Sequence, residues 1–422
     1  MKRQTKIYLI VLLFIAGSHT AIAQGGARVN YVVSDEAAAK IVSSVLRVSP
    51  VIDGHNDLFI HYFDCKECPR DLMAYRIDVA AKGHTDIPRW RKGGVGGQLL
   101  NIFGSEQTSE SQLSAYDLLH RMEAAYPNDL RVVGTSREMR AASRNGKIAI
   151  LPTLESAVRL KNNMALLRSY YDLGLRSVTF AYRTNDLADG SEDTPKHNGV
   201  SSFGKEMIKE MNRLGIMIDA SHVSADAMNG ILDSSQAPII FSHSNARALC
   251  DVNRNVPDQV LRKLKTNRGI VMLTFVPYFV SHDMSKWMDD SEAYFELLSK
   301  KYSGDMSKAT AEMDAWETTN PQPIVTISAM ADQFDYVKNL IGVEYLGIAG
   351  DYDGIPFTIK GLEDVSTYPN LLIELAKRGW TEKDLRKITG ENFLRVFEEV
   401  EAKAAALKKT MQPSMVKFVD KK

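Results

Sequence analysis

The residues best suited to chemistry begin with a histidine and an aspartate, two positions apart, at the end of an apolar run. The run Val51-Ile52-Asp53-Gly54 leads directly into His55-Asn56-Asp57. Residues two apart in an extended strand point to the same face, so His55 and Asp57 can reach one point in space. A His-x-Asp triplet alone is a weak signal. Its interpretation as part of a metal site depends on further ligands elsewhere in the chain.

Further metal-binding side chains close other short apolar runs, and these are Glu155, His222 and His243. Each has a structural alternative, because a glutamate can sit near a helix N-terminus and a histidine can be a core residue. Together with His55 and Asp57 they exceed the needs of one tetrahedral zinc with an open position. They suit two ions, with His55 and Asp57 on one, His222 and His243 on the other, and Glu155 bridging. The ligand set favours zinc and also admits manganese, iron or cobalt.

Asp351 closes the last apolar run and is the predicted catalytic proton carrier. A metal pair can hold a bridging water, lower its pKa and polarise the bond that the water attacks. A carboxylate beside two cations stays ionised, accepts the proton of that water and passes it to the leaving amine. Asp353 is the alternative, two residues further on the same face. Asp351 is preferred because it lies closer to the strand end.

These residues require a scaffold that brings strand ends together. Eight apolar runs lie at residues 51–58, 97–102, 148–155, 177–182, 216–222, 238–243, 270–275 and 346–351. Segments of helical character separate most of them, at residues 115–125, 157–171, 203–214, 225–232 and 257–264, and another helix is expected at 34–48. This alternation predicts parallel strands and a closed (β/α)₈ TIM-type barrel, whose chemistry gathers at the carboxyl ends of the strands. The rival is a doubly wound open sheet, but no Gly-x-Gly-x-x-Gly follows an early strand.

The ends of the chain predict an exported protein of one domain. Residues 1–23 combine a basic start, a short apolar run and a small-x-small site, as in a secretory signal peptide, although an uncleaved anchor is the alternative. Residues 24–422 are then a single barrel domain, periplasmic or secreted, with no membrane span after cleavage. A segment at about 281–323 interrupts the barrel rhythm as an insertion, either a lid or a decoration.

The composition narrows the set of partners. Lys plus Arg equals Asp plus Glu at 52 each, so nothing favours nucleic acid or an anionic membrane surface. Of the three cysteines, Cys65 and Cys68 form either a local disulfide or two free thiols, and Cys250 is expected to be single and buried. A homodimer is the default expectation for such a barrel.

The order of these motifs resembles the membrane (renal) dipeptidase family of the amidohydrolase superfamily. The matching pieces are Val51-Ile52-Asp53-Gly54-His55-Asn56-Asp57, Gly96-Gly97-Gln98, Leu154-Glu155, Ala220-Ser221-His222-Val223-Ser224, Phe241-Ser242-His243-Ser244, Arg254-Asn255-Val256-Pro257-Asp258, Gly350-Asp351-Tyr352-Asp353-Gly354 and Gly361-Leu362-Glu363-Asp364-Val365. The resemblance implies zinc-dependent hydrolysis of dipeptides and assigns the same five ligands and Asp351. It also implies that Arg254 binds the terminal carboxylate of the substrate, a natural bidentate partner.

The fourth run departs from the family pattern. The family usually has Leu-Thr-x-Thr-His there, with a His associated with the substrate and the tetrahedral intermediate, whereas this chain has Val178-Thr179-Phe180-Ala181-Tyr182. Tyr182 can still donate a hydrogen bond, though not as an imidazolium. Either Tyr182 stabilises the oxyanion, or the substrate range has moved. The insertion at 281–323 is a second departure, longer than the family pattern leads us to expect.

Three functions follow from this reasoning. In the first, an exported metallo-dipeptidase uses a bridging water as nucleophile, Asp351 as proton shuttle and Arg254 to select a free C-terminal carboxylate, and the family commonly tolerates a C-terminal D-residue. The second keeps the two metals and acts on another small amide, lactam or ester. The third is a metal-dependent binding protein without catalysis, against which the intact set of ligands and acid argues.

Overall fold

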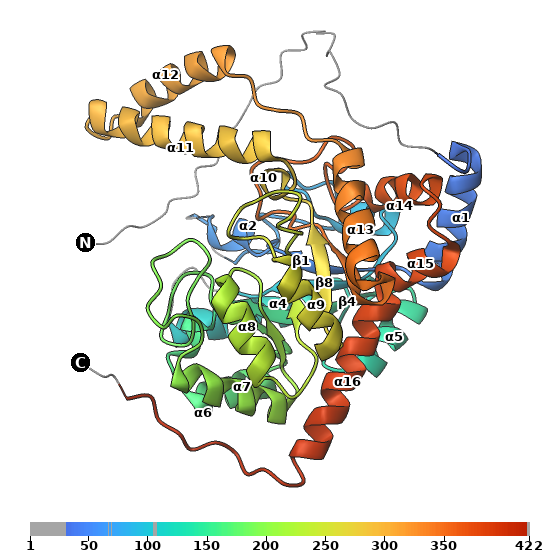
Figure 1. Ribbon diagram of the computed structural model, residues 1–422, viewed down its shortest axis with the longest axis vertical. Helices are drawn as coiled ribbons and strands as arrows, with labels where there is room; N and C mark the ends of the chain where they lie inside the picture. Colours follow the sequence, from blue (N-terminus) through green and yellow to red (C-terminus); the bar gives the residue numbers. More distant parts are fainter. Residues whose placement is uncertain (1–30, 66, 69, 104–107, 420–422) are drawn as a thin grey trace.

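The structure is a computed structural model that describes residues 31–65, 67–68, 70–103 and 108–419 (Figure 1). The predicted signal peptide at residues 1–23 lies outside the described residues. Among the helices of the described part, none combines the length and the apolar character that a membrane crossing requires.

A closed parallel barrel forms the centre of the molecule. Within the described residues its strands are β1 (Val51–Asn56), β2 (Val95–Asn101), β4 (Ile148–Glu155), β5 (Ser177–Thr179), β6 (Met217–Asp219), β7 (Ile240–Phe241), β8 (Ile270–Thr274) and β9 (Leu346–Ala349). They are hydrogen-bonded in the order β2-β1-β9-β8-β7-β6-β5-β4, and β2 also pairs with β4, which closes the ring. The predicted (β/α)₈ barrel is therefore confirmed, and a doubly wound open sheet is excluded because the ring has no free edge.

A further short strand, β3 (Leu130–Val132), lies outside the ring. It pairs with residues 148–150 of β4, on the edge that β5 takes from Thr153 onward. The sequence did not predict this strand, because three residues show no measurable alternation.

Several strands end earlier than predicted. β6 ends at Asp219 and β9 at Ala349, so His222 and Asp351 lie in the turns that follow. These two residues have φ of 67° and 56°, a left-handed conformation in which a strand cannot continue. The direction of each side chain is therefore set by its turn and not by strand alternation.

Helices cover the outside of the barrel (Figure 1). The longer ones are α1 (Asp35–Val48), α3 (Ile87–Lys92), α4 (Ser109–Ala125), α5 (Ser136–Arg144), α6 (Met164–Asp172), α7 (Ser202–Leu214), α8 (Ala225–Ser234), α9 (Asp258–Asn267), α13 (Ile327–Ile341), α14 (Tyr368–Lys377), α15 (Glu382–Arg386) and α16 (Asn392–Leu407). Shorter segments are α2 (Ile60–Phe63), α10 (Pro277–Val280), the 3₁₀ helices η1 (Ala157–Leu160) and η2 (Val343–Tyr345), and the π-helix η3 (Lys387–Glu391).

Local signals explain where two of these helices begin. Ser34 caps α1, because its side chain accepts a hydrogen bond from the backbone N–H of Ala37. The single helix expected at 157–171 is instead divided into η1 and α6. Lys161 and Asn162 both have positive φ, which breaks the helix, and the Asn163 side chain then caps α6.

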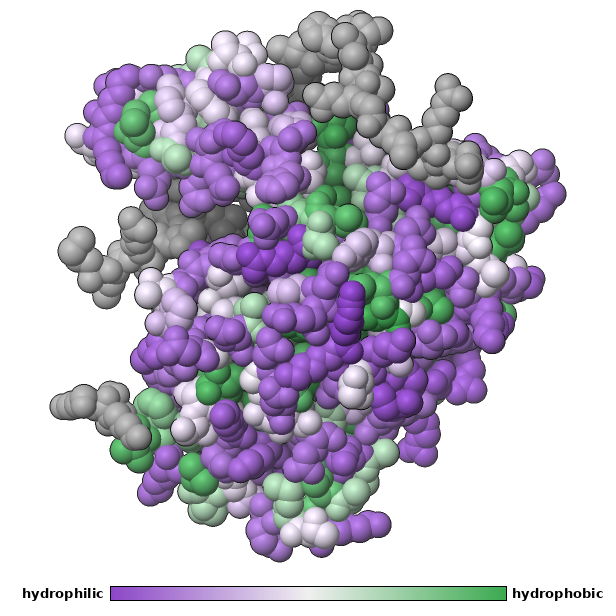
Figure 2. Space-filling model, viewed as in Figure 1, coloured by the Kyte–Doolittle hydropathy of each residue, from purple (hydrophilic) through white to green (hydrophobic). Residues whose placement is uncertain are grey.

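Residues 281–323 contain a hairpin of two helices, α11 (His282–Lys301) and α12 (Met306–Thr319), hereafter the hairpin. It follows α10, which in turn follows the carboxyl end of β8, and in Figure 1 it projects away from the barrel. Trp287 packs edge-on against Phe357 at its base. The face of the hairpin seen in Figure 2 is mostly hydrophilic. The insertion therefore leaves the barrel at the strand ends that carry the candidate site.

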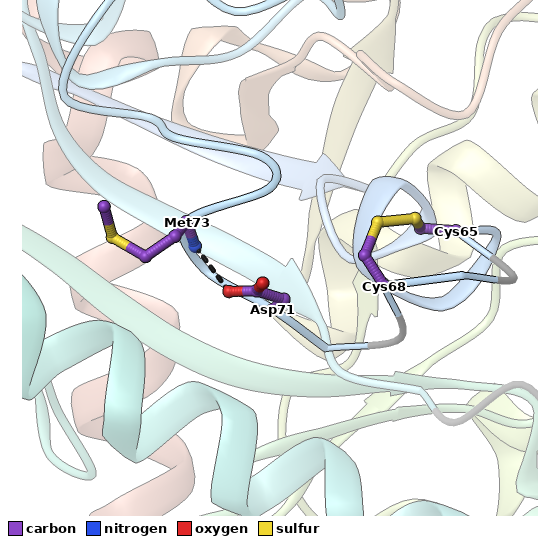
Figure 3. The surroundings of a disulfide bond; sticks show 4 residues. All are labelled: Cys65, Cys68, Asp71 and Met73. Atoms are coloured by element: carbon purple, nitrogen blue, oxygen red, sulfur yellow. Dashed lines mark hydrogen bonds between the residues drawn. A yellow bond between two sulfur atoms is a disulfide. The ribbon is translucent and has the colours of Figure 1, made fainter.

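The cysteines adopt one of the two predicted arrangements. Cys65 and Cys68 form a disulfide with Cα atoms 5.2 Å apart, in the loop after α2 (Figure 3). The next turn of this loop is closed by Asp71, whose side chain accepts a hydrogen bond of 2.8 Å from the backbone N–H of Met73. Cys250 is unpaired and buried, as predicted.

Candidate metal centre and substrate site

The candidate ligands converge at the carboxyl ends of the strands. His55 Nε2 lies 3.4 Å from Asp57 Oδ2 and 3.8 Å from Glu155 Oε1. From the other side, Glu155 Oε1 lies 3.0 Å from His222 Nε2 and 3.4 Å from His243 Nε2. The Glu155 carboxylate therefore lies between the two pairs, where a bridging ligand would have to be.

The electrostatics of the cluster favour a cation. Burial lowers the pKa of His55, but the carboxylates of Asp57 and Glu155 raise it more, so that its net pKa lies well above the usual range. Burial, reinforced by the positive charges of Arg254 and His55, lowers the pKa of His222 and His243 well below that range. The centre thus attracts positive charge at His55 while it keeps two imidazoles neutral, the form that binds metal.

Several features of the cluster indicate that its donor atoms fit metal ions. Among the residues that the structure describes, His55 Nε2 is buried without a hydrogen-bond partner. His222 Nε2 and His243 Nε2 face one another at 2.8 Å, so the two imidazoles point to the same space, where an ion could accept a lone pair from each. Groups of three such side chains, His55 with Glu155 and His243, and His55 with Asp57 and Asp351, each place their ligand atoms within 4.8 Å of one another. The residues present therefore fit a metal ion.

Asn101 at the end of β2 orients two of the carboxylates. Its amide nitrogen donates to Asp57 Oδ1 at 2.8 Å and to Glu155 Oε2 at 3.1 Å, while its oxygen accepts from the Glu155 backbone N–H at 3.0 Å. The sequence analysis did not single out Asn101. The signal was present, because Asn101 is a polar residue at a strand end like the others.

A second support holds His243. Ser242 Oγ donates to Asp219 Oδ2 at 2.6 Å and lies 2.6 Å from His243 Nδ1, so Nδ1 carries the proton and donates to Ser242. This tautomer leaves the lone pair of His243 on Nε2, which faces Glu155. Asp219 in turn accepts from the backbone N–H groups of Ser221 and Ser242. These supporting residues were also missed, since nothing in the sequence distinguishes them from ordinary core polar residues.

The structure separates Asp351 from Asp353. Asp351 Oδ1 lies 3.9 Å from His55 Nε2. Burial, with the nearby charges of Asp57 and Glu155, raises the pKa of Asp351 to about 7, even though His55 lowers it. The Asp353 carboxylate instead receives hydrogen bonds from His61 and from the backbone of His84. Asp351 is thus the carboxylate that joins the cluster.

Arg254 lies within reach of the centre and is 1% exposed. Its Nη1 donates to Ser244 Oγ at 2.6 Å and its Nη2 donates to the backbone carbonyl of His243 at 2.7 Å. Its Nε is buried with no hydrogen-bond partner, and the Phe279 ring lies 5.4 Å from the guanidinium carbon. A buried guanidinium with an unused donor is equipped to receive an anionic group.

Tyr182 lies in the loop after β5, beside the ligands. Its ring centroid is 4.4 Å from that of His222, and the residue is 45% exposed. Burial of the hydroxyl and the charges of Glu155 and Asp57 raise its pKa. The hydroxyl therefore stays protonated at neutral pH and can act as a hydrogen-bond donor.

Comparisons with known proteins agree with this geometry. The model of the membrane dipeptidase family, peptidase family M19, matches residues 39–411. Dipeptidase 3 of Rattus norvegicus is 34% identical over 379 residues, which cover 87% of this chain and 68% of the rat protein. Dipeptidase tcpJ of Claviceps purpurea is 34% identical over 375 residues, which cover 84% of this chain and 78% of the fungal protein.

Solved structures share the fold. The probable dipeptidase PvdM from Pseudomonas aeruginosa superimposes with a TM-score of 0.75 at 24% identity, covering 87% of this chain and 100% of that one. A metallo peptidase from Rhodobacter sphaeroides, liganded with a phosphinate mimic of the dipeptide L-Ala-D-Ala, superimposes with a TM-score of 0.68 at 23% identity, covering 84% and 99%. The extent of the family match and the identity to the curated dipeptidases establish that this chain belongs to the membrane dipeptidase family, M19, and is a dipeptidase of that metallopeptidase family.

Proposed function

We propose that the protein hydrolyses dipeptides with a free C-terminal carboxylate, using two divalent metal ions, with zinc preferred. The ligands in this proposal are His55, Asp57, Glu155, His222 and His243. The observation that carries it is the position of Glu155 Oε1, which lies within 3.8 Å of the Nε2 atoms of all three histidines. A carboxylate that meets imidazoles from both sides is placed where it could bind an ion on either side.

Asp351 acts as the proton shuttle. The metal pair, when bound, lowers the pKa of a bridging water and polarises the peptide carbonyl. The Asp351 carboxylate takes up the proton of that water as it attacks and delivers it to the amine that leaves. Its burial and the pKa of about 7 support this role, because a group that carries protons in both directions works best near the ambient pH.

Arg254 selects the substrate by its terminal carboxylate. Hydrogen bonds from both Nη groups hold the buried guanidinium in place, and its Nε donor is left unused. A carboxylate there gains a charge-assisted hydrogen bond in a site of low dielectric. Tolerance of a D-residue at that position is supported by the R. sphaeroides peptidase, whose ligand mimics L-Ala-D-Ala.

Tyr182 stabilises the oxyanion in place of the usual family histidine. Its hydroxyl stays protonated and its ring lies beside that of His222, which supports a role in donating to the negative charge that develops on the attacked carbonyl oxygen. The same substitution favours one alternative, a hydrolase of another small amide, lactam or ester with the same metal centre. A phenol donates a neutral hydrogen bond, and this changes which carbonyl groups are activated best.

We propose further that residues 1–23 direct export and are removed, so that the protein acts in the periplasm or outside the cell. The Cys65–Cys68 disulfide supports this, because disulfides persist in oxidising compartments. N-terminal sequencing of the protein from separated cell fractions tests the cleavage site. Sedimentation of the mature protein tests whether it is a homodimer.

The decisive experiment measures turnover of L-Ala-D-Ala and L-Ala-L-Ala by residues 24–422, loaded with zinc and then stripped by a chelator. Asp351→Asn is compared with Asp172→Asn, a matched change at an exposed position on α6. We expect metal-dependent turnover that is lost in the first variant and kept in the second. Protein that holds two metals and cleaves neither dipeptide would contradict the proposal and favour the alternative substrates, with esters and lactams tested next on wild type and Tyr182→His.

A further inference from the structure

The turn that carries Asp351 is held in a conformation that its residues do not favour. Asp351 and Asp353 have φ of 56° and 67°, both in the left-handed region. Residues with a side chain keep such backbone angles only where surrounding contacts hold them in place. The contacts of the turn, residues 350–354, therefore determine where the Asp351 carboxylate points.

Asp53 on β1 and Asp57 just after it form hydrogen bonds with the backbone of the turn. The Asp57 N–H donates to the Tyr352 carbonyl at 3.0 Å, and the Asp53 carboxylate accepts from the Gly350 N–H at 2.8 Å. A side chain at Gly354 would collide with Asp57 Oδ2 and press on Asp351 Oδ1. These contacts place the turn against Asp57, a predicted metal ligand. They involve Gly350, Tyr352 and Gly354.

His84 grips residue 353 from the opposite side. The Asp353 N–H donates to His84 Nδ1 at 3.0 Å, and the His84 N–H donates back to Asp353 Oδ1 at 2.6 Å. Burial lowers the pKa of His84, which keeps the ring neutral and Nδ1 able to accept. The two reciprocal hydrogen bonds fix both the backbone and the side chain of Asp353.

His61 completes the grip. Its Nε2 lies 2.9 Å from Asp353 Oδ1, and its ring stacks on Tyr75 with centroids 4.4 Å apart. The Gly83 N–H donates to the Tyr75 hydroxyl, and a side chain at Gly83 would collide with both Asp353 Oδ1 and His61 Nε2. Two histidines from the segment between β1 and β2, His61 on α2 and His84 in the loop before α3, thus contact a carboxylate two residues from the proton shuttle.

We propose that His84, supported by His61, is a positioning residue that holds the 350–354 turn so that the Asp351 carboxylate faces the metal centre. The inference rests on the proposed role of Asp351 as proton carrier. His84 acts on Asp351 through Asp353 and does not touch the substrate. Its loss affects proton transfer more than substrate binding or metal binding.

The test compares His84→Ala with His84→Asn in the zinc-loaded protein. The Asn side chain can place an oxygen near the position of Nδ1 and accept from the Asp353 N–H, whereas Ala cannot. We expect His84→Ala to lower kcat by about 10- to 100-fold, as for other residues that orient a catalytic group, with KM within about twofold and the metal content unchanged. His84→Asn should recover most of the rate, and His120→Ala, at an exposed histidine of α4, should match wild type.

A second readout does not depend on activity. Hydrogen exchange of the peptide that contains residues 350–355 should be faster in His84→Ala and close to wild type in His84→Asn, because the Asp353 amide loses and then regains its acceptor. Unchanged kcat and exchange in His84→Ala would overturn the inference, and so would loss of bound metal. If His84→Ala does not fold, His84→Gln replaces it, since Gln displaces the acceptor by one carbon, and full activity of that variant would overturn the inference equally.

The two proposals fail in different ways. An active Asp351→Asn variant would remove the proposed shuttle, whatever His84 does. An inactive Asp351→Asn variant beside a fully active His84→Ala variant would leave the shuttle standing and remove the positioning role alone.

Discussion

The turns after the barrel strands and the hairpin lie on the same face of the molecule, but their charged side chains differ in exposure. Those at the strand ends are buried, whereas those of the hairpin are exposed to water. At the strand ends and in the turns, His55, His243 and Asp351 are at most 9% exposed, and other polar groups of the site lie beside each of them. In the hairpin, the ion pair between Lys286 and Asp290 has side chains 74% and 53% exposed. The hairpin core is correspondingly small, formed by Leu298, Ala309 and Met313.

This contrast indicates which charged side chains have a large effect on the protein. Desolvating an ionisable group is costly, and it persists only where a partner, a proton or a metal compensates. Exposed ion pairs contribute almost nothing to stability, because water already solvates both partners. The same substitution made at the strand ends and in the hairpin should therefore have very different effects, and the hairpin supplies matched controls for the site.

Glu155→Gln against Glu312→Gln should show the largest difference. Loss of the bridging charge leaves the two halves of the centre without their shared ligand, and we expect kcat/KM to fall by about 10⁴-fold or more, since such ligands act as a unit. Glu312 pairs with Lys301 on the hairpin surface, and its variant should hydrolyse dipeptides at the wild-type rate. Metal content and dipeptide turnover measured side by side decide the matter. A Glu155→Gln protein with two metals and normal turnover would contradict the bridging role.

Asp351→Asn against Asp290→Asn should separate activity from stability. The pKa of Asp351 is raised to about 7 in the fold, above its ordinary value of 3.8. A raised carboxyl pKa means that the folded state holds the proton more tightly, so this contribution to stability is complete below pH 3.8 and is lost as the pH rises through 7. The metal-free protein should lose up to about 4 kcal/mol from this group over that window, and Asp351→Asn should escape the loss.

The measurement is thermal unfolding of chelator-stripped protein at pH 5 and pH 8. Wild type and Asp290→Asn should both be clearly less stable at pH 8, and added zinc should restore them, because a cation then compensates the ionised carboxylate. Asp351→Asn should change less with pH while its kcat falls by about 10²- to 10⁴-fold, the usual contribution of a general acid or base. Equal pH dependence in all three proteins would show that Asp351 is not held in an anionic environment.

Ser242→Ala against Ser307→Ala tests the support beneath a ligand. Without Ser242 Oγ, the His243 Nδ1 proton loses its acceptor, and the tautomer with a free Nε2 is no longer favoured. We expect affinity for zinc to fall by about 10- to 100-fold, measured by competition with a chelator. Ser307 is exposed on α12 and its variant should bind zinc normally. Unchanged affinity in Ser242→Ala would mean that Asp219 and Ser242 only pack the core.

What the sequence could and could not predict follows the same division. The barrel, and the meeting of the candidate ligands at one end of it, were predictable because apolar runs, turn spacing and metal-binding side chains at strand ends are all local signals. The sequence favoured Asp351 over Asp353 by its position near the strand end, but the different partners of the two carboxylates, each on a residue of positive φ, needed the structure. Asn101 carried the same signal as the ligands, a polar residue at a strand end, and was overlooked, whereas Ser242 was missed because its role depends on which side chains lie beside it, and one sequence does not show that.

The hairpin was the least predictable region, and it should give the smallest effect. Its charges carry no local signal of function, which left the choice between a lid and a decoration open. Lys286→Ala breaks an exposed pair between residues one helical turn apart, so we expect the free energy of unfolding to change by no more than about 0.5 kcal/mol and kcat/KM to stay at the wild-type value. Urea unfolding and dipeptide turnover at low and high salt provide the measurement. A salt-dependent change in KM at unchanged stability would instead mean that the hairpin charges interact with the substrate. The division between charges that affect function and charges that do not would then lie within the hairpin.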